Sequence, residues 1–563
     1  MHKQPIIECV PNFSEGRDMR IIEQITREIE RVEGVKLLDV DPGKATNRTV
    51  VTFVGAPEPV VEAAFRAIRK AAELIDMSKH EGAHPRMGAT DVCPLVPVAN
   101  ISMEECVEWA RRLGQRVGDE LGIPVYLYEY AATRPERRNL ATIRAGEYEG
   151  LADKLRNPDW KPDFGPAVFN PRTGATVIGA RDFLVAYNVN LNTTSVRRAN
   201  SVAFDVREKG RVKRIGDPIT GPIERDENGE PVRIPGACKA VKAIGWYIPE
   251  YGLAQVSMNL TNLSVTPLHQ AFDACCRSAE SRGMRVTGSE IVGMVPLQVL
   301  LDAGRYFLQK QNWSTGASEE ELIHIAVKSL GLDELGPFDP KKKIIEYRLR
   351  EDEHRPLVNM SLRSLANETA KGTPTPGGGS VAAAVGALGA ALGAMVANLS
   401  AAKRGWDDRI PEFSHWAEKG QRLKDDLLTL VDDDTNAFNG IMEAFRLPKE
   451  TEEDKATRKN AIQQATLYAT EVPLHTMELA AEVFDLTEAM VKEGNPSSVT
   501  DAAVGALCAH AAVHAAWLNV RINAKSLEDA SKASELTSKA QALAERADAA
   551  LKRILSTARE KMV

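Results

Sequence analysis

The sequence predicts an α/β fold of two βαββαβ-like sandwich subdomains, followed by an all-α helical-bundle domain. Three observations lead to this fold class. Up to about residue 350, short β-rich runs alternate with amphipathic helical segments. The same order recurs more weakly beyond residue 182, and from Ser361 onward the pattern is helical only. We expect subdomains at 1–182 and 183–348, a linker at 349–357 and the helical domain at 358–563.

The first subdomain is predicted from runs that change their hydrophobic period. Period-2 runs rich in Val, Ile and Leu indicate strands, and apolar residues three and four apart indicate helices. In chain order we expect a strand "IIECVPNF", a helix "DMRIIEQITREIERV", strands "VKLLDVD" and "TVVTFVG", and a helix "PEPVVEAAFRAIRKAAELI".

The second subdomain repeats the strand-to-helix transitions, with helices on one face of a sheet. Residues 214–236 are polar and contain Pro and Gly, so we expect a long surface loop there. The expected elements are strands "FLVAYNVNL", "KAIGWYIP" and "LAQVSMNLT", a helix "TPLHQAFDACCRSAESRG", and a closing unit "SEIVGMVPLQVLLDAG".

The helical domain is predicted from long amphipathic or small-residue-rich segments after a charged, aperiodic join, "LREDEHRPLVNM". Residues 380–402 carry no charge and are long enough to cross a bilayer. They consist mostly of Ala and Gly and lack flanking aromatic residues, so a buried helix of a soluble bundle is the favoured interpretation. A membrane span is the alternative.

Composition restricts the partners. The 563 residues carry a net charge of −7 and no polybasic block, which argues against nucleic acid. Seven scattered cysteines without paired metal spacing are typical of reduced thiols in a cytosol. The N-terminus lacks the apolar core of a signal peptide. We therefore expect a cytoplasmic protein with no membrane association, no metal and no tightly held redox cofactor.

The stretch "KHEGAHPRMGATDVCPLVPV" contains a candidate catalytic base, His84. Pro85 forces the backbone of His84 into an extended conformation, so the side chain loses little further entropy when it faces a ligand. Imidazole also has a pKa suited to proton transfer near neutral pH. The alternative is a surface-loop histidine without a catalytic role.

Motifs in both halves resemble one bifunctional family. "ECVPNFSEG", "LLDVDPGKATNRTVVTFVG", "HPRMGATDVCP", "IRAGEYEGL" and "DWKPDFGP" resemble the formiminotransferase domain of the formimidoyltransferase-cyclodeaminase family. "TPTPGGGSVAAAVGALGAALGAMVANL", "TLVDDDTNAF" and "EAFRLPK" resemble its cyclodeaminase domain. The resemblance implies transfer of a formimino group from N-formiminoglutamate to N5 of tetrahydrofolate. Cyclisation to 5,10-methenyltetrahydrofolate with release of ammonia then follows, as steps of histidine degradation.

For the transferase, the resemblance implies that His84 is the catalytic base. Asp41 matches an acidic residue of the family's site, although a turn-forming role before Pro42 is the alternative. Arg48 and Arg86 are candidates for binding the substrate's carboxylates, because a guanidinium group binds a carboxylate through two parallel hydrogen bonds. Arg86 is favoured because it lies two residues from His84, and a solvated surface arginine is the alternative for each. The folate-contacting loop would consist of Gly165, Pro166, Ala167, Val168, Phe169, Asn170, Pro171, Arg172, Thr173 and Gly174, or these residues are a plain linker.

For the cyclodeaminase, the resemblance points to Asp434 as the residue that exchanges protons with N10 and the departing amine. Asp432 and Asp433 precede it, and because consecutive helix residues lie about 100° apart we expect most of these acids to be solvated. The glycine-rich helix entry could bind a folate carboxylate or simply permit tight packing. The further candidates for this second folate site are Gly377, Gly378, Gly379, Asp501, Asn519 and Asn523.

The resemblance implies small-molecule substrates, tetrahydrofolate as a polyglutamylated co-substrate and a homo-oligomer. Two alternatives concern the helical domain. It could be a methenyltetrahydrofolate cyclohydrolase, which has the same bundle, or a non-catalytic oligomerisation scaffold. Intact Asp434 and the intact glycine-rich entry argue against the scaffold.

Overall fold

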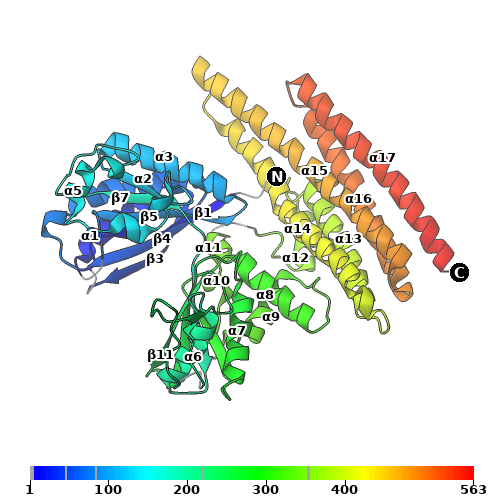
Figure 1. The fold of residues 1–563 in the computed structure, drawn as a ribbon. Coiled ribbons are helices and arrows are strands. Elements are labelled where there is room, and N and C mark those ends of the chain that lie inside the picture. The colour runs from blue at the N-terminus through cyan, green and yellow to red at the C-terminus, as the bar shows by residue number, and fades with distance from the viewer. Residues whose placement is uncertain (1–4, 45–46, 83–84, 217–219, 351–354, 563) are drawn as a thin grey trace. The chain divides into compact units, whose positions relative to one another are not determined.

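The computed structural model describes residues 5–44, 47–82, 85–216, 220–350 and 355–562. It divides into two compact units (Figure 1). The first comprises Met1–Val299 and Leu330–Asp352, and the second comprises Leu300–Ser329 and Glu353–Val563. The first unit is mixed α/β and the second is helical, which confirms the predicted fold class.

The first unit begins with a seven-stranded sheet, counted over the described residues. The strand order is β1-β4-β2-β5-β7-β6, with β3 paired to β4. β7 runs parallel to β5 and β6, and the other pairs are antiparallel. The strands are β1 (Ile6–Cys9), β2 (Asn12–Phe13), β3 (Val35–Gly43), β4 (Arg48–Gly55), β5 (Thr90–Ala99), β6 (Val125–Glu129) and β7 (Thr176–Ala180).

Alternation along the strands gives this sheet two covered faces. Leu127 of β6 and Ile178 of β7 pack into a core with α1 (Met19–Glu30), α2 (Pro57–Leu74) and α3 (Met103–Leu121). Their neighbours Tyr126 and Val177 point to the opposite face, where they meet residues of α4 (Leu140–Arg144) and α5 (Leu151–Arg156). Helices were expected on one face only, so the cover by α4 and α5 is an addition to that prediction.

The second sheet of this unit is antiparallel, in the order β11-β12-β8-β13. The predicted surface loop at 214–236 contains one strand of a short ribbon, in which β10 pairs with β9. The elements are β8 (Val185–Leu191), β9 (Arg211–Val212), β10 (Arg233–Ile234), β11 (Val241–Ile248), β12 (Leu253–Leu260) and β13 (Val286–Val292), with helices α6 (Val196–Val206), α7 (Leu268–Glu280), α10 (Pro340–Lys343) and α11 (Ile345–Arg350).

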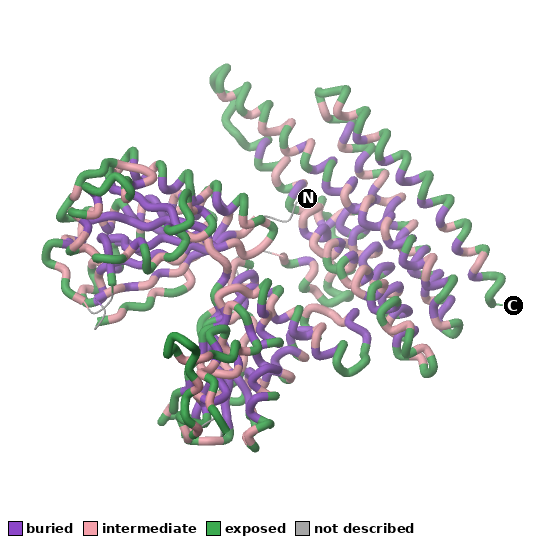
Figure 2. Tube along the Cα trace, in the orientation of Figure 1, coloured by how far each residue is buried: buried purple, intermediate pink, exposed green. Residues whose placement is uncertain are grey.

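Long helices build the second unit, and their inner faces are buried (Figure 2). The C-terminal helix is capped, since the Asp529 side chain accepts a hydrogen bond from the Lys532 amide. The helices are α12 (Leu362–Thr369), α13 (Gly378–Ala401), α14 (Ile410–Arg446), α15 (Glu452–Glu493), α16 (Val499–Ala524) and α17 (Ala530–Lys561), joined by parts of α8 (Leu297–Lys310) and α9 (Glu319–Leu330).

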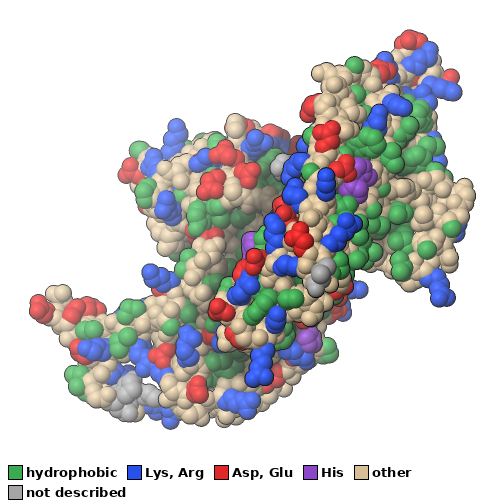
Figure 3. Space-filling model, turned by 90° about the vertical axis from the view of Figure 1, so that its right-hand side faces the viewer, with side chains coloured by type: hydrophobic (Ala, Val, Ile, Leu, Met, Phe, Trp, Pro, Cys, Tyr) green, Lys and Arg blue, Asp and Glu red, His purple; other side chains and the backbone are tan. Residues whose placement is uncertain are grey.

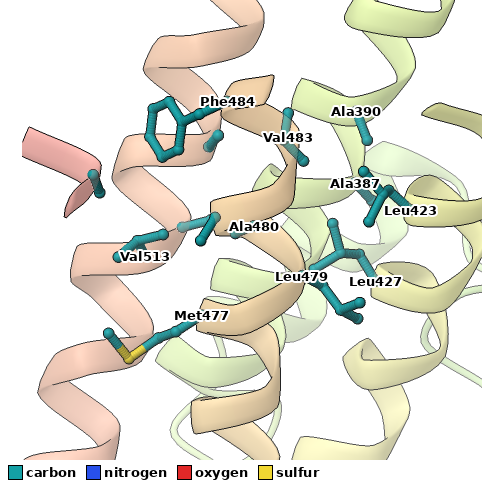
Figure 4. Packing of buried hydrophobic residues seen from close by; sticks show 14 of the residues in the cluster. Ala387, Ala390, Leu423, Leu427, Met477, Leu479, Ala480, Val483, Phe484 and Val513 are labelled. Carbon is teal, nitrogen blue, oxygen red and sulfur yellow. The ribbon is translucent and has the colours of Figure 1, made fainter. Parts of the chain in front are cut away.

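Small residues let α13 approach its neighbours closely. A Cβ atom on Gly393 would lie 2.6 Å from the Leu486 side chain, and one on Gly389 would lie 2.8 Å from the Gly505 carbonyl. Figure 4 shows Ala387 and other small residues among larger side chains of the same core. By length and composition alone, α13 and the segment Pro496–Ala524 could cross a membrane, which is weak evidence because core helices pass the same test.

Residues 300–329 cluster with the helical unit, which the sequence pattern did not predict. The loop between α8 and α9 is buried at Ser314–Gly316. The Asn398 amide of α13 holds both ends of this stretch. It accepts a hydrogen bond from Ser314 Oγ at 2.6 Å and donates one to the Gly316 carbonyl at 2.9 Å. The division into 1–182, 183–348, 349–357 and 358–563 stays a prediction.

Candidate active sites

The predicted base, His84, lies outside the described residues, so its neighbours define the first candidate site. Arg86 is buried and donates two hydrogen bonds to Glu149, at 2.9 and 2.7 Å. It donates a further bond to Glu147 at 3.3 Å, and its Nε donates to His80 Nδ1 at 3.2 Å. Hydrogen bonding to Glu149 raises the pKa of Arg86. The arginine therefore links the His84 segment to the turn at 147–149.

These contacts bear on the assignment of Arg86 to a substrate carboxylate. Its guanidinium already faces two carboxylates of its own chain, so a substrate would have to displace them. A positioning role fits the observed geometry better. Glu147 and Glu149 lie in "IRAGEYEGL", a motif that contributed to the resemblance, but nothing in its pattern showed that they would meet Arg86.

A second set of hydrogen bonds ties the loop before β4 to the same segment. Asn47 is buried, and its side chain donates to the Glu81 carbonyl at 3.0 Å. The Asn47 carbonyl lies 2.9 Å from His80 Nε2. Beside these residues lies an open cleft of about 470 Å³ lined by Glu81, Gly82, Arg86, Gly146, Glu147 and Glu149. His84 follows Gly82, one of the lining residues, by two positions in the chain.

The predicted folate loop, Gly165–Gly174, lies against the same segment at its C-terminal end. Gly174 adopts a φ of +65°, and a Cβ atom there would lie 2.2 Å from the Met87 carbonyl, so only glycine fits. The Tyr148 hydroxyl donates to the Pro171 carbonyl at 2.6 Å, and the Tyr148 ring packs 5.5 Å from the Phe169 ring. Earlier in the loop, Val168 is 67% exposed. The loop thus has a fixed end beside the His84 segment and an open end.

A larger cavity of about 700 Å³ in the same unit is cationic. Arg48, which the sequence made a candidate for binding a carboxylate, lines it. Burial lowers the pKa of Arg48, and the positive charge of Arg144 adds to this effect. Arg144 forms an ion pair with buried Asp91. The charged lining residues are Arg48, Arg138, Arg144, Arg181, Lys242, Glu129 and Asp182.

This excess of positive charge suits a ligand with carboxylates. Sequence reasoning missed Arg138, Arg144, Arg181 and Lys242, because they come from separate segments and no short motif unites them. Asp41 lies exposed on β3. Its negative charge acts to raise the pKa of Arg48 and so opposes the effect of burial.

The second candidate site surrounds Asp434 of α14. Its carboxylate accepts hydrogen bonds from the Ser380 amide at 2.8 Å and from Ser380 Oγ at 3.1 Å. A Cβ atom on Gly379 would lie 2.0 Å from Asp434 Oδ1, so the glycine makes room for the carboxylate. Burial raises the pKa of Asp434, although the hydrogen bonds from Ser380 oppose the shift. The structure thus unites the glycine-rich entry of α13 with the predicted acid.

Asp432 corrects one expectation. Sequence reasoning placed it among solvated acids, but only 2% of it is exposed. Its two carboxylate oxygens accept hydrogen bonds from the amides of Leu357 and Val358, at 2.9 and 3.0 Å. Asp432 and Asp434 face different partners, as the rotation of about 100° between consecutive helix residues predicts. Asp432 nevertheless faces protein rather than water.

The remaining candidates of the second site do not all come together. A Cβ atom on Gly378 would lie 3.6 Å from the Asn519 amide nitrogen, so these two residues are neighbours. The Asn523 side chain donates to the Ala469 carbonyl at 2.6 Å and joins α16 to α15. Asp501 lies about 27 Å from Asn519 along α16, at 1.5 Å per residue, which is too far for one shared site.

Three family domains match this chain in order. Residues 6–181 match the formiminotransferase domain, N-terminal subdomain, residues 186–350 the formiminotransferase domain, and residues 361–542 formiminotransferase-cyclodeaminase. The formimidoyltransferase-cyclodeaminase of Mus musculus is 44% identical over 525 residues, which cover 93% of each chain. The chain belongs to the formimidoyltransferase-cyclodeaminase family.

Two further relatives match this chain over different lengths. The formimidoyltransferase-cyclodeaminase of Dictyostelium discoideum is 43% identical over 552 residues, which cover 98% of each chain. A methenyltetrahydrofolate cyclohydrolase of Methylorubrum extorquens is 38% identical over 204 residues, which cover 36% of this chain and 98% of the relative. Membership of the bifunctional family, predicted from the motifs, is confirmed.

Proposed function

We propose that the first unit transfers the formimino group of N-formiminoglutamate to N5 of tetrahydrofolate, and that the helical unit cyclises the product with loss of ammonia. The observation that carries this proposal is Asp434, a largely buried carboxyl with a raised pKa at the glycine-rich start of α13. Relatives that match across both units and carry both activities in their name support it.

In the transfer step, N5 attacks the formimino carbon, the bond from that carbon to the glutamate nitrogen breaks, and glutamate leaves with a proton. His84 is proposed to accept the proton from N5 and return it to the leaving amine. The hydrogen bonds from Arg86 to Glu149 hold in place a residue that follows His84 by two positions in the chain. The cationic cavity with Arg48 is proposed to hold carboxylates of the substrate or of a folate polyglutamate tail.

In the cyclisation step, N10 attacks the formimino carbon and loses its proton, and the amino group leaves as ammonia. One carboxyl can serve both proton transfers in turn, if it exchanges protons near neutral pH. Burial of Asp434 moves its pKa in that direction. Asn519 beside Gly378 is proposed to contact the pterin, and the amides of Gly378 and Gly379 at the start of α13 to bind a folate carboxylate.

Cyclohydrolase activity of the helical unit is the second candidate. The match to almost the full length of the M. extorquens cyclohydrolase favours it. Water would then open the methenyl ring, and no ammonia would be released. Incubation with formiminoglutamate and tetrahydrofolate, followed by methenyl absorbance and ammonia together, separates the two. The proposed function requires both signals to rise. Absorbance that rises only in the presence of a separate cyclodeaminase would contradict it.

We propose further that the chain forms a homo-oligomer through the helical unit. Hydrophobic side chains gather in patches on the surface (Figure 3). On α13, Val381, Leu388 and Met395 are exposed at seven-residue spacing, and α16 exposes Val504 and Leu507 nearby. Such a stripe fits a second copy of this chain. Leu388→Glu should reduce the mass in solution to that of a smaller assembly, and an unchanged mass would contradict this interface.

We propose a cytoplasmic location because of the state of the cysteine thiols. All seven cysteines are free in the structure, and five of them are buried. Cys9 and Cys93 lie with their sulfurs 3.5 Å apart without a disulfide. Free buried thiols persist where the surroundings are reducing.

A further inference from the structure

Two histidines and an aspartate meet on the surface of the helical unit, in residues that neither proposed activity uses. His510 and His514 lie four positions apart on α16, so their side chains share one face of the helix. The carboxylate of Asp548 on α17 faces both. Its Oδ1 lies 2.7 Å from His510 Nε2 and 3.0 Å from His514 Nε2, and the two rings are 4.3 Å apart.

This arrangement has the dimensions of a metal site. Three ligand atoms, one from each residue, all lie within 4.8 Å of one another. In a tetrahedral zinc site with bonds of about 2.0–2.1 Å, neighbouring ligand atoms are about 3.3 Å apart. Small side-chain rotations would therefore open the cluster around one ion. Imidazole nitrogen with one carboxylate oxygen is a ligand set that suits zinc and its neighbours rather than magnesium.

We propose that His510, His514 and Asp548 bind one zinc ion, with a fourth position open to water. In the metal-free protein the carboxylate accepts hydrogen bonds from the two rings, and the ion replaces the bridging protons. Because the ligands come from two helices, the ion cross-links α16 to α17. The sequence predicted no metal because its cysteines lack paired metal spacing. A pair of histidines one helical turn apart is a ligand pattern that needs no cysteine.

The test uses the full chain, treated with a chelator and then titrated with zinc chloride by calorimetry. We expect a site of one ion per chain whose affinity falls about 10–100-fold or more in His514→Ala and in Asp548→Asn. His475→Ala is the matched control, because His475 is similarly exposed and also contacts a carboxylate, Glu478. Within the described part of the chain it belongs to no cluster of ligand atoms like that of His510 and His514. The control should bind zinc like the wild type.

Two further readouts follow the coordination itself. Cobalt should give the intense visible absorption of a tetrahedral site in the wild type and lose it in Asp548→Asn, which keeps the fold because the residue is exposed. Saturating zinc should raise the Tm of the wild type by about 5–10 °C, and magnesium should leave it unchanged. Equal zinc affinity in wild type, His514→Ala and Asp548→Asn would overturn the proposal, as would no binding at about 100-fold excess over the protein.

Discussion

At the residue scale, the three consecutive acids of α14 have different environments. Asp434 faces the amide and hydroxyl of Ser380, and Asp432 binds the backbone at Leu357 and Val358. Asp433 lies between them. Burial raises the pKa of Tyr468, and the negative charge of Asp433 raises it further. The sequence pattern predicted that these acids would face different directions. It could not show which direction leads to backbone amides, because those amides are 54 to 75 residues away along the chain.

Asp432→Asn should destabilise the helical unit. The carboxylate accepts two backbone hydrogen bonds, whereas an amide can accept only through its oxygen and would turn an NH₂ group toward the second amide. We expect a loss of about 1–3 kcal/mol in the free energy of unfolding, measured by urea denaturation. Asp485→Asn, which loses only a surface contact with Lys419, is the control and should change stability by less than about 1 kcal/mol. Equal stability of the two variants would refute the structural role.

Glu8 of β1 should make the stability of the first unit depend on pH. Burial raises its pKa from 4.5 to about 7, although the positive charge of Arg181 opposes the shift. Between these values the unfolded chain releases a proton that the folded chain keeps, so stability falls as pH rises through that window. In Glu8→Gln the free energy of unfolding should fall less with rising pH, by up to about 3 kcal/mol. Thermal unfolding from pH 4.5 to 8 measures it. The exposed Glu30→Gln should keep the wild-type slope.

At the element scale, the loop between α8 and α9 shows what periodicity cannot predict. The alternation of strands and helices correctly indicated β8, β11, β12 and α7, because each has a clear hydrophobic period of its own. The position of Ser314–Gly316 depends instead on two polar atoms of Asn398 in α13 and on the space beside Ala417. A Cβ atom on Gly316 would lie 2.1 Å from the Ala417 Cβ. Such a fit is a tertiary property that one chain segment does not encode.

Asn398→Ala should loosen this loop. The substitution removes the acceptor for Ser314 Oγ and one of two side-chain donors to the Gly316 carbonyl, the other being Gln421. Both partners lie in a buried stretch. We expect a loss of about 1–3 kcal/mol in the stability of the helical unit and faster amide exchange at residues 314–316. Asn439→Ala, at an exposed position of α14, should leave both unchanged. Unaltered exchange in Asn398→Ala would show that other contacts hold the loop.

At the scale of the whole molecule, the chain carries two candidate sites on two compact units. The fold class and the family could be predicted from the sequence, because motifs and periodicity persist over hundreds of residues. The cationic cavity could not, since its arginines and lysine are scattered between residues 48 and 242. The resemblance named Asp434 and the glycine-rich entry, but it did not predict the pairing of Asp434 with Ser380. It also named Asp501, which lies far from Asn519 along α16.

Two separate sites imply two separable losses of activity. Asp434→Asn cannot exchange a proton near neutral pH, so it should release glutamate from formiminoglutamate but no ammonia. Asp433→Asn is its neighbour control and should release both. His84→Ala should lose about 10²–10⁴-fold in transfer, and yet release ammonia from supplied 5-formiminotetrahydrofolate at nearly the wild-type rate.

The most direct measurement is therefore glutamate and ammonia, quantified together for wild type, Asp434→Asn and His84→Ala with each of the two substrates. Two independent sites predict opposite patterns: glutamate without ammonia in Asp434→Asn, and ammonia only from the supplied intermediate in His84→Ala. Loss of both products in either variant, or ammonia release by Asp434→Asn at the wild-type rate, would contradict the assignment of one chemistry to each unit.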